Sequence, residues 1–141
     1  MKKLIYLVIM TVLVACASKN TSDTKKPIFE ILTTQSDGGA NIRFYEILSE
    51  PKEINMLLSD PNLKRKIKQE DIQTSNFIIL NMGEKSSGGY KIKVENVEET
   101  AINIVVTIKE IIPAVNDNTI FVLSSPYTIV KINSKKPIVI K

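Results

Sequence analysis

Few residues in this sequence have the types and spacing that catalysis requires. Lys85 stands beside Ser86 and Ser87, and a lysine that takes up the proton of a serine would create a nucleophile. Glu98 and Glu99 are an adjacent pair of carboxylates, the groups that general acid–base chemistry uses. Both signals are weak, because a lysine and serines in a loop are usually solvated and neighbouring residues of a strand point to opposite faces.

Histidine is absent from all 141 residues, and Cys16 is the only cysteine. The chain can therefore build no Ser-His-Asp triad, no Cys-His dyad and no imidazole metal site. A single cysteine also allows no internal disulfide and no thiolate cluster. We predict a protein that is not an enzyme and that has no catalytic residue, no metal and no other cofactor.

The first sixteen residues predict the destination of the protein. Met1 to Lys3 is a basic start, and Leu4 to Val14 is an apolar run that is shorter than the roughly 20 residues of a membrane-spanning helix. Leu13-Val14-Ala15-Cys16 resembles the lipobox of bacterial lipoproteins, which implies cleavage before Cys16 and a diacylglyceryl group on its thiol. Residues 1–15 would then be a lipoprotein signal peptide. The alternatives are an uncleaved anchor, or a plain signal peptide followed by an unrelated cysteine.

Residues 16–27 are rich in Ser, Thr, Asn, Asp and Lys and predict a lipidated, flexible tether. The eleven residues after Cys16 reach at most about 40 Å at about 3.5 Å each, so the folded part should lie close to its membrane. No acidic run follows Cys16, which favours the periplasmic face of the outer membrane. Removing residues 1–15 lowers the formal net charge from +4 to +2, too little to predict a nucleic-acid partner.

Residues 28–141 predict one β-rich domain. Residues 28–34 and 42–48 flank a turn that contains Gly38 and Gly39, and together they predict a β-hairpin. Further strands are expected where apolar residues run together or alternate with polar ones, at 76–82, 90–97, 101–112, 120–123, 127–132 and 138–140. The expected fold is α+β and mainly antiparallel, with six to eight strands in a sandwich or open barrel and one helix.

The one helix is expected after Ser49 or Glu50, with Pro51 in its first turn and Asp60-Pro61 at its end. Its apolar face comes from residues spaced three and four apart, Ile54, Leu57 and Leu58.

The polar stretch at 62–75 is expected to join this helix to the next strand. It contains a basic cluster at 64–68, which either contacts anionic lipid headgroups or is a solvated loop or frayed helix end. Glu70 and Asp71 beside it weaken its field.

The most unusual segment is the loop at 83–90, Gly-Glu-Lys-Ser-Ser-Gly-Gly-Tyr, which holds three of the five glycines. Gly88 and Gly89 precede a strand, where they allow a tight turn, a bulge or a close approach by another backbone. The loop does not predict phosphate binding, because the Walker pattern places Gly-Lys-Ser/Thr before a helix.

This loop resembles the signature of the PrcB family of protease-complex components, whose C-terminal domain carries Gly-x-Lys-x-Ser/Thr-Gly-Gly-Tyr before an alternating strand. Gly83, Lys85, Ser87 and Gly88-Gly89-Tyr90 match that pattern, with serine where the family often has threonine. Two later segments agree as well, Glu110-Ile111-Ile112-Pro113 and Ser125-Pro126-Tyr127. The resemblance covers roughly residues 42–141, although the aspartate expected next to Phe77 is missing.

The resemblance implies an accessory, non-catalytic lipoprotein that binds and stabilises an envelope partner such as an exported protease complex. The lipid on Cys16 would make the membrane its other partner. Loops on a β scaffold commonly carry binding, and tyrosine is favoured at interfaces. The residues expected to contact the partner are Lys85, Ser87, Gly88, Gly89, Tyr90, Pro113, Pro126 and Tyr127.

Three alternatives stay open at this point. The domain could inhibit a protease by presenting a rigid loop, or it could be a structural envelope lipoprotein without a dedicated partner. The glycine loop itself could be a structural hairpin, with Tyr90 packed on the sheet.

Overall fold

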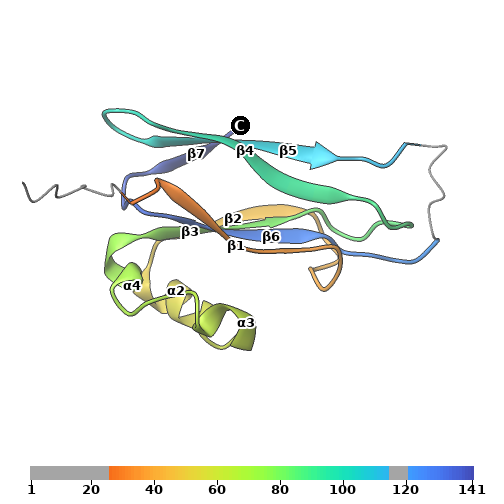
Figure 1. Cartoon of the computed structure of the whole chain (residues 1–141), viewed down its shortest axis with the longest axis horizontal. Helices are drawn as coiled ribbons and strands as arrows, with labels where there is room; N and C mark the ends of the chain where they lie inside the picture. Colours follow the sequence, from red (N-terminus) through yellow and green to blue (C-terminus); the bar gives the residue numbers. More distant parts are fainter. Residues whose placement is uncertain (1–25, 115–120) are drawn as a thin grey trace, which may run out of the picture.

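The computed structural model describes residues 26–114 and 121–141. Within these residues, seven strands form two sheets, and three short helices cover one of them (Figure 1). No helix in this part of the chain is long and apolar enough to cross a membrane. Cys16, the expected signal peptide at 1–15 and the first ten residues of the expected tether lie outside the described residues.

The larger sheet has the strand order β1 (Phe29–Gln35), β6 (Tyr127–Ile132), β3 (Asn76–Asn81) and β2 (Phe44–Leu48). All of its neighbouring strands are antiparallel. The apolar run at 76–82 predicts a central strand, and β3 confirms this because it lies inside the sheet.

The smaller sheet consists of β4 (Lys91–Glu99), β5 (Ile104–Ile111) and β7 (Ile138–Ile140), in that order. β4 and β5 are antiparallel, and β7 runs parallel to β5. The two sheets stack face to face (Figure 1). The fold is therefore an α+β sandwich that is mainly antiparallel, as the sequence predicts, and not an open barrel.

Two layers of buried apolar side chains hold the sheets and helices together. The adjacent residues Phe77 and Ile78 on β3 belong to different layers. Phe77 belongs to the layer between the larger sheet and the helices, and Ile78 to the layer between the two sheets. Successive residues of a strand point to opposite faces, so a strand buried on both sides needs apolar residues at every position. This explains why β3 shows no alternation in sequence.

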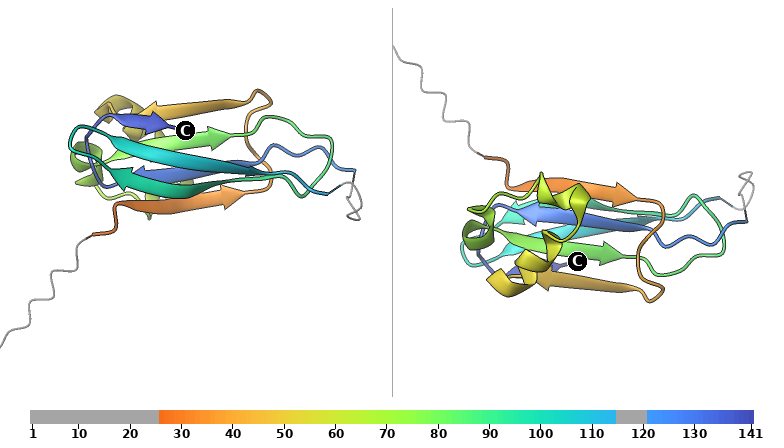
Figure 2. Two further views of the ribbon diagram at one scale, coloured as in Figure 1. Left: turned by 90° about the horizontal axis from the view of Figure 1, so that it is seen from above. Right: turned by 90° about the horizontal axis from the view of Figure 1, so that it is seen from below.

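The helical layer is larger than the sequence predicts. α2 (Pro51–Leu57) is the expected helix, and the Glu50 backbone N–H donates a 3.1 Å hydrogen bond to the Glu53 carboxylate at its start. The expected linker at 62–75 instead contains two further short helices, α3 (Pro61–Lys64) and α4 (Asp71–Thr74). These helices lie over the larger sheet on the side away from the smaller one (Figure 2).

The reason for this difference is visible at Asp60-Pro61. Asp60 accepts a 2.7 Å hydrogen bond from the Asn62 N–H, so it caps a new helix, and proline fits the first helical position as well as it ends a preceding helix. The apolar residues spaced through the polar stretch are buried under the sheet, namely Leu63, Ile67 and Ile72.

The predicted hairpin between residues 28–34 and 42–48 is wrong. β1 and β2 lie at opposite edges of the larger sheet, β1 pairs with β6, and β2 pairs with β3. Phe29 lies opposite Ile132, more than 100 residues away in the chain. A turn signal between two strands predicts local pairing, but here the more buried strands β3 and β6 come between them.

The predicted strand at 120–123 is also wrong over the residues that the structure describes. Phe121, Val122 and Leu123 belong to no strand, and all three side chains are exposed. Ser124, the next residue, forms an isolated antiparallel bridge with Lys85.

Candidate functional site

The glycine loop is fixed at one end of the sandwich by hydrogen bonds to segments far away in the sequence. The Lys85 N–H donates to the Ser124 carbonyl at 2.7 Å, and the Ser124 N–H donates back to the Lys85 carbonyl at 3.0 Å. The Ser124 hydroxyl donates a 2.9 Å hydrogen bond to the Ser87 carbonyl. Ser87 and Ser124 are both buried, so this part of the expected binding motif supports the loop from within.

The glycines of the loop differ in what they do. Gly89 has a φ of 91°, and a Cβ at this position would lie 3.0 Å from the Pro113 ring, so another residue there would be strained. Gly88 has no heavy atom within 4 Å of the place where a Cβ would stand. Gly89 is therefore required by the fold, whereas Gly88 opens onto solvent and is free to contact a partner.

Lys85 and Tyr90 lie together on this loop. The Lys85 ammonium stands over the Tyr90 ring, 5.7 Å from its centroid, which is a cation–π contact. Tyr90 is half-buried and packs against the layer between the two sheets.

The structure brings most of the predicted contact residues together, but not all of them. Lys85, Ser87, Gly88, Gly89 and Tyr90 share the loop, and Pro113 lies against Gly89. Pro126 is buried and adjoins the start of the loop, because its carbonyl accepts a 3.0 Å hydrogen bond from the Met82 N–H. Tyr127 packs against the layer under the helices, so it lies on the other side of the larger sheet from Tyr90. The role of each residue in binding stays a prediction.

Sequence reasoning missed Asn81, which fastens the neighbouring β1–β2 connection to this end of the sandwich. Its side-chain oxygen accepts from the Ala40 N–H at 3.1 Å, and its amide nitrogen donates to the carbonyls of Ala40 and Ile42 at 2.9 Å and 2.6 Å. Gly39 packs so closely that a Cβ there would lie 2.2 Å from the Asn81 oxygen. The sequence did carry a signal for this role, because Asn81 lies in a strand that was predicted to be central. A buried side-chain amide needs hydrogen-bond partners.

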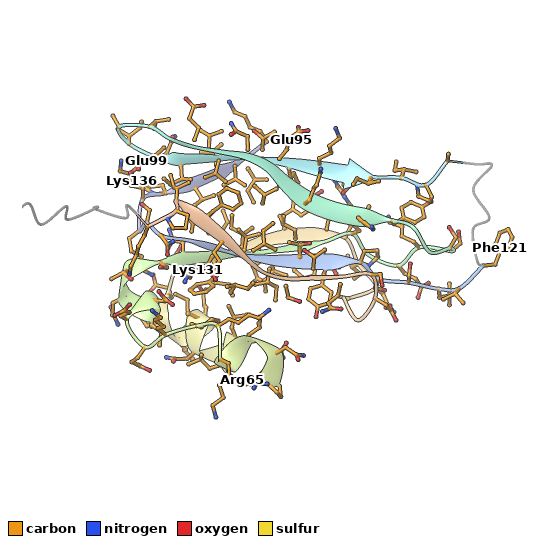
Figure 3. All side chains as sticks on the ribbon, viewed as in Figure 1. Arg65, Glu95, Glu99, Phe121, Lys131 and Lys136 are labelled. Atoms are coloured by element: carbon orange, nitrogen blue, oxygen red, sulfur yellow. The ribbon has the colours of Figure 1, made fainter. Side chains whose placement is uncertain are left out.

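Exposed apolar side chains gather around the same loop. Phe121 is 90% exposed and stands at the tip of this end of the sandwich (Figure 3). Val122 and Leu123 follow it and are also exposed, and Leu123 directly precedes the residue that bridges to Lys85. Ile112 is exposed and precedes Pro113, which touches Gly89. We call these four residues, with Lys85, Gly88 and Tyr90, the loop surface.

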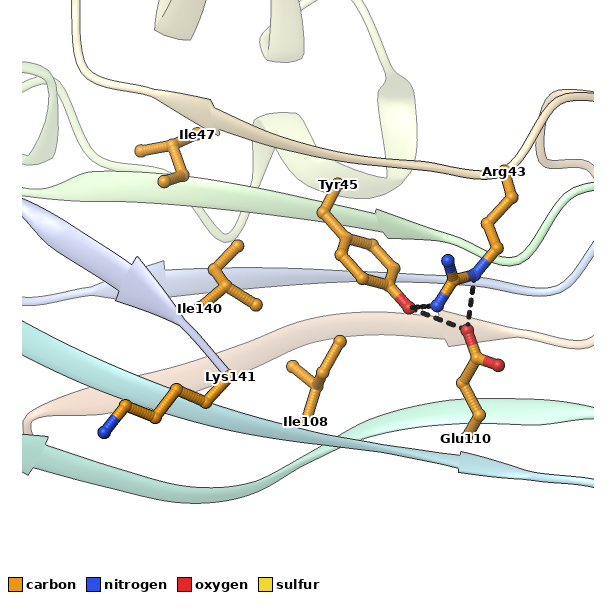
Figure 4. A pocket seen from close by; sticks show the side chains of 7 residues that line it. All are labelled: Arg43, Tyr45, Ile47, Ile108, Glu110, Ile140 and Lys141. Carbon is orange, nitrogen blue, oxygen red and sulfur yellow. Dashed lines mark hydrogen bonds and ion pairs between the residues drawn. The ribbon is translucent and has the colours of Figure 1, made fainter.

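A groove of about 580 Å³ opens near the loop surface, between the edges of the two sheets (Figure 4). Ile47, Ile108 and Ile140 give it an apolar lining, and Lys141 lines it too. From the sequence, the three isoleucines were predicted only as strand residues, and Lys141 was given no role.

Three polar residues close one end of this groove. A single oxygen of the Glu110 carboxylate accepts a 2.9 Å hydrogen bond from Arg43 Nε and a 2.7 Å hydrogen bond from the Tyr45 hydroxyl. Arg43 also donates a 2.6 Å hydrogen bond to the Tyr45 oxygen. The spacing Arg43-x-Tyr45 was the only sequence signal, because residues two apart on a strand share a face.

The hydrogen bonds and charges within this network shift the pKa values of Glu110 and Tyr45. The hydrogen bond from Tyr45 lowers the pKa of Glu110, the interactions with Arg43 add to the effect, and the charge of Lys85 contributes further. Burial, followed by the hydrogen bond to Glu110, raises the pKa of Tyr45 to about 12. Lys85 thus connects the groove with the loop surface electrostatically.

One of the two adjacent carboxylates at positions 98 and 99 is held in an ion pair. Glu99 forms a 2.8 Å ion pair with Lys136, so the adjacent pair Glu98-Glu99 does not act as two free carboxylates. Within residues 26–114 and 121–141, no three His, Cys, Asp or Glu side chains lie close enough to hold a metal ion.

Comparison with known families gives a match over part of the chain. Residues 76–133 match the family model described as PrcB C-terminal. The chain is therefore similar to the PrcB C-terminal family over these residues. The PrcB segment runs from the start of β3 to just beyond β6 and includes the whole glycine loop, Pro113, Pro126 and Tyr127. It confirms the resemblance over a shorter range than the expected 42–141. No curated protein and no solved structure matches the chain.

Proposed function

We propose that this chain is a lipid-anchored, non-catalytic protein of the cell envelope that binds and stabilises an exported partner, namely a protease complex. The PrcB C-terminal segment supports the link to a protease complex. The basic start, the apolar run and the lipobox support an anchor on Cys16, with the domain at the periplasmic face of the outer membrane.

The observation that carries this proposal is the set of exposed apolar side chains on the loop surface. Ile112, Phe121, Val122 and Leu123 are all exposed large hydrophobic residues. Single exposed apolar residues are ordinary, but a group of them on one surface marks a place where another protein binds. An exposed phenylalanine on a supported scaffold has the properties of an interface anchor.

The position of this surface fits a tethered binding protein. β1, which follows the expected tether, begins at the end of the sandwich opposite to Phe121 (Figure 3). A lipid at Cys16 would therefore hold the fold at one end and leave the loop surface at the other end free for a partner.

The residues near the loop surface also suit binding better than catalysis. The polar groups of the loop are used in its own support, since the Ser87 carbonyl bonds to Ser124 and the Lys85 ammonium lies over Tyr90. The chain has no histidine to activate a serine.

Affinity capture with the lipidated full-length protein from solubilised envelope, followed by mass spectrometry, tests this proposal. We expect an exported protease in the eluate, and we expect Phe121→Ser combined with Leu123→Ser to remove it. Ile102→Ser is the matched control, because Ile102 is 78% exposed but lies on the β4–β5 connection at the other end of the sandwich.

The activity of the captured protease separates stabilisation from inhibition. We expect activity to persist or rise when the protein is added, and a fall would show an inhibitor instead. Equal capture by the wild type and by the double variant would overturn the role of the loop surface.

A further inference from the structure

A groove lined by charged side chains lies between the start of β1 and the helix layer. Its volume is about 450 Å³, and five cationic and three acidic side chains line it. Lys26 and Pro27, at the start of the described chain, form part of its wall. The groove therefore lies where the expected tether joins the fold.

All three acidic side chains of this groove form ion pairs. Glu70 pairs with Lys26 at 3.6 Å. Lys131, which is only 8% exposed, pairs with Glu30 at 3.0 Å and with the buried Asp71 at 3.4 Å. Asp71 also accepts a 2.8 Å hydrogen bond from the Lys68 backbone N–H.

Basic side chains are left over after this pairing. Lys64, Arg65 and Lys68 are exposed, and none of the three forms an ion pair within the described part of the chain. Arg65 points away from the sheet on the outer side of the helix layer (Figure 3). Lys66 differs, because its ammonium donates to the Leu32 carbonyl, and this bond fixes the cluster to β1. We call Lys64, Arg65 and Lys68 the basic face.

We propose that the basic face docks onto anionic phospholipid headgroups of the membrane that holds the lipid on Cys16. This inference rests on the lipid anchor of the proposed function. Cys16 lies ten residues before Lys26, and ten residues reach at most about 35 Å, so the anchor keeps the basic face within reach of the bilayer surface.

The charge of the basic face is opposite to that of the headgroups. Each basic side chain near an anionic bilayer strengthens binding about fivefold, and salt screens the attraction over about 8 to 10 Å. The helix layer would then face the membrane, and the long axis of the sandwich would lie along it. Phe121, at the far end of that axis, stays in the aqueous phase for its partner.

A single fluorescent label on the full-length lipidated protein tests this orientation. With Cys16 acylated, an engineered cysteine is the only free thiol, so Gln69→Cys places the label beside the basic face. Asn96→Cys is the matched control, since it also replaces an exposed amide but lies on β4 of the other sheet. The probes are vesicles of phosphatidylcholine alone and vesicles with about one third phosphatidylglycerol, each with a quencher on the headgroup.

We expect the label at position 69 to be quenched strongly on phosphatidylglycerol vesicles and weakly on phosphatidylcholine vesicles. High salt, or Arg65→Glu combined with Lys68→Glu, should reduce this quenching at least tenfold. Lys91→Glu combined with Lys93→Glu on β4 makes the same charge change away from the basic face and should have no effect. Equal quenching at positions 69 and 96, or quenching that the charge reversal leaves unchanged, would overturn the inference.

Further measurements test the lipid anchor on Cys16 and the docking of the basic face independently of each other. Intact mass and flotation with phosphatidylcholine vesicles report whether Cys16 carries lipid. If the protein lacks the lipid, flotation with phosphatidylglycerol vesicles must still be stronger for the wild type than for the Arg65→Glu and Lys68→Glu variant. No such difference would overturn the docking inference whatever the state of Cys16.

Discussion

The Tyr45 hydroxyl on β2 donates a 2.7 Å hydrogen bond to the Glu110 carboxylate on β5, and this contact joins the two sheets at the open side of the sandwich. Arg43 completes the network with a 2.9 Å hydrogen bond to the same carboxylate oxygen. Most of the packing between the sheets is apolar, and the Thr128 hydroxyl on β6 donates a further 2.7 Å hydrogen bond to the Ile92 carbonyl on β4. These polar contacts fix the position of one sheet relative to the other.

A double-mutant cycle of Tyr45→Phe and Glu110→Gln should measure this contact. We expect a coupling free energy of about 1 kcal/mol, because the hydrogen bond is charge-assisted and partly shielded from water. Urea unfolding of the four proteins gives the value. The matched cycle is Lys109→Met with Glu95→Gln, an ion pair whose two side chains are about half exposed, and it should give less than about 0.5 kcal/mol. Equal coupling in the two cycles would contradict the assigned role.

The network also predicts how stability depends on alkaline pH. Burial and the Glu110 hydrogen bond raise the pKa of Tyr45 from 10.0 to about 12. Neutral Tyr45 therefore stabilises the fold fully below pH 10, and this contribution is lost as the pH rises through 12. The stability advantage of the wild type over Tyr45→Phe should shrink over that window.

Ultraviolet absorbance of ionised tyrosine checks the same assignment. Tyr45→Phe should remove a late-ionising tyrosine, and Glu110→Gln should shift that ionisation to lower pH. An unchanged titration in Glu110→Gln would show that the Glu110 hydrogen bond does not hold the proton on Tyr45.

Lys131→Met should destabilise the fold by about 3 to 5 kcal/mol, because it leaves the buried carboxylate of Asp71 without its ion-pair partner. Burial alone lowers the pKa of Lys131, but the hydrogen bonds and charges of Glu30 and Asp71 outweigh it, so the pKa is raised above 10.5. Thermal or urea unfolding measures the loss. Lys136→Met is the control, since Lys136 is more exposed and pairs with Glu99, and it should cost about 1 kcal/mol or less. A loss as small as that of the control would mean that Asp71 finds another partner.

The two adjacent glycines of the loop should respond differently to alanine. Gly88→Ala should leave stability within about 0.5 kcal/mol, because its Cβ would meet open space. Gly89→Ala should cost about 1 to 3 kcal/mol, because its φ is 91° and its Cβ would press on Pro113. The melting temperatures of the two single variants, each compared with that of the wild type, measure this difference. If both lower the melting temperature equally, position 88 also supports the loop and is not a clean probe of partner contact.

Some elements could be predicted because their signal is local. The alternation of Lys and Glu with Ile and Val predicts β4, and β4 buries Ile92 and Val94 while Lys91 and Lys93 face solvent. Pro51 and the spacing of Ile54 and Leu57 predict α2, whose first residue is Pro51. Each of these signals depends on residues within about one turn or a few strand positions.

The candidate site was predicted only in part for the same reason. The glycine loop was visible as a motif, but the hydrogen bonds that fix it come from Asn41 and Ser124, which lie about 40 residues to either side. Asn81 and Glu110 form their hydrogen bonds with residues that are about 40 and 65 positions away in the sequence. The exposed position of Phe121 was hidden because an apolar run predicts a strand as readily as a surface loop.

By itself, the sequence determined most of the segments that become strands, the position of the glycine loop and the absence of histidine chemistry. Those properties follow from residue type and short periods. Only the tertiary structure decided that β1 pairs with β6, that β1 and β2 lie at opposite edges, and that Lys131 neutralises Asp71. The physical reason is that a period of two shows which face of a strand is buried, whereas its neighbour is chosen by the packing of the whole sheet.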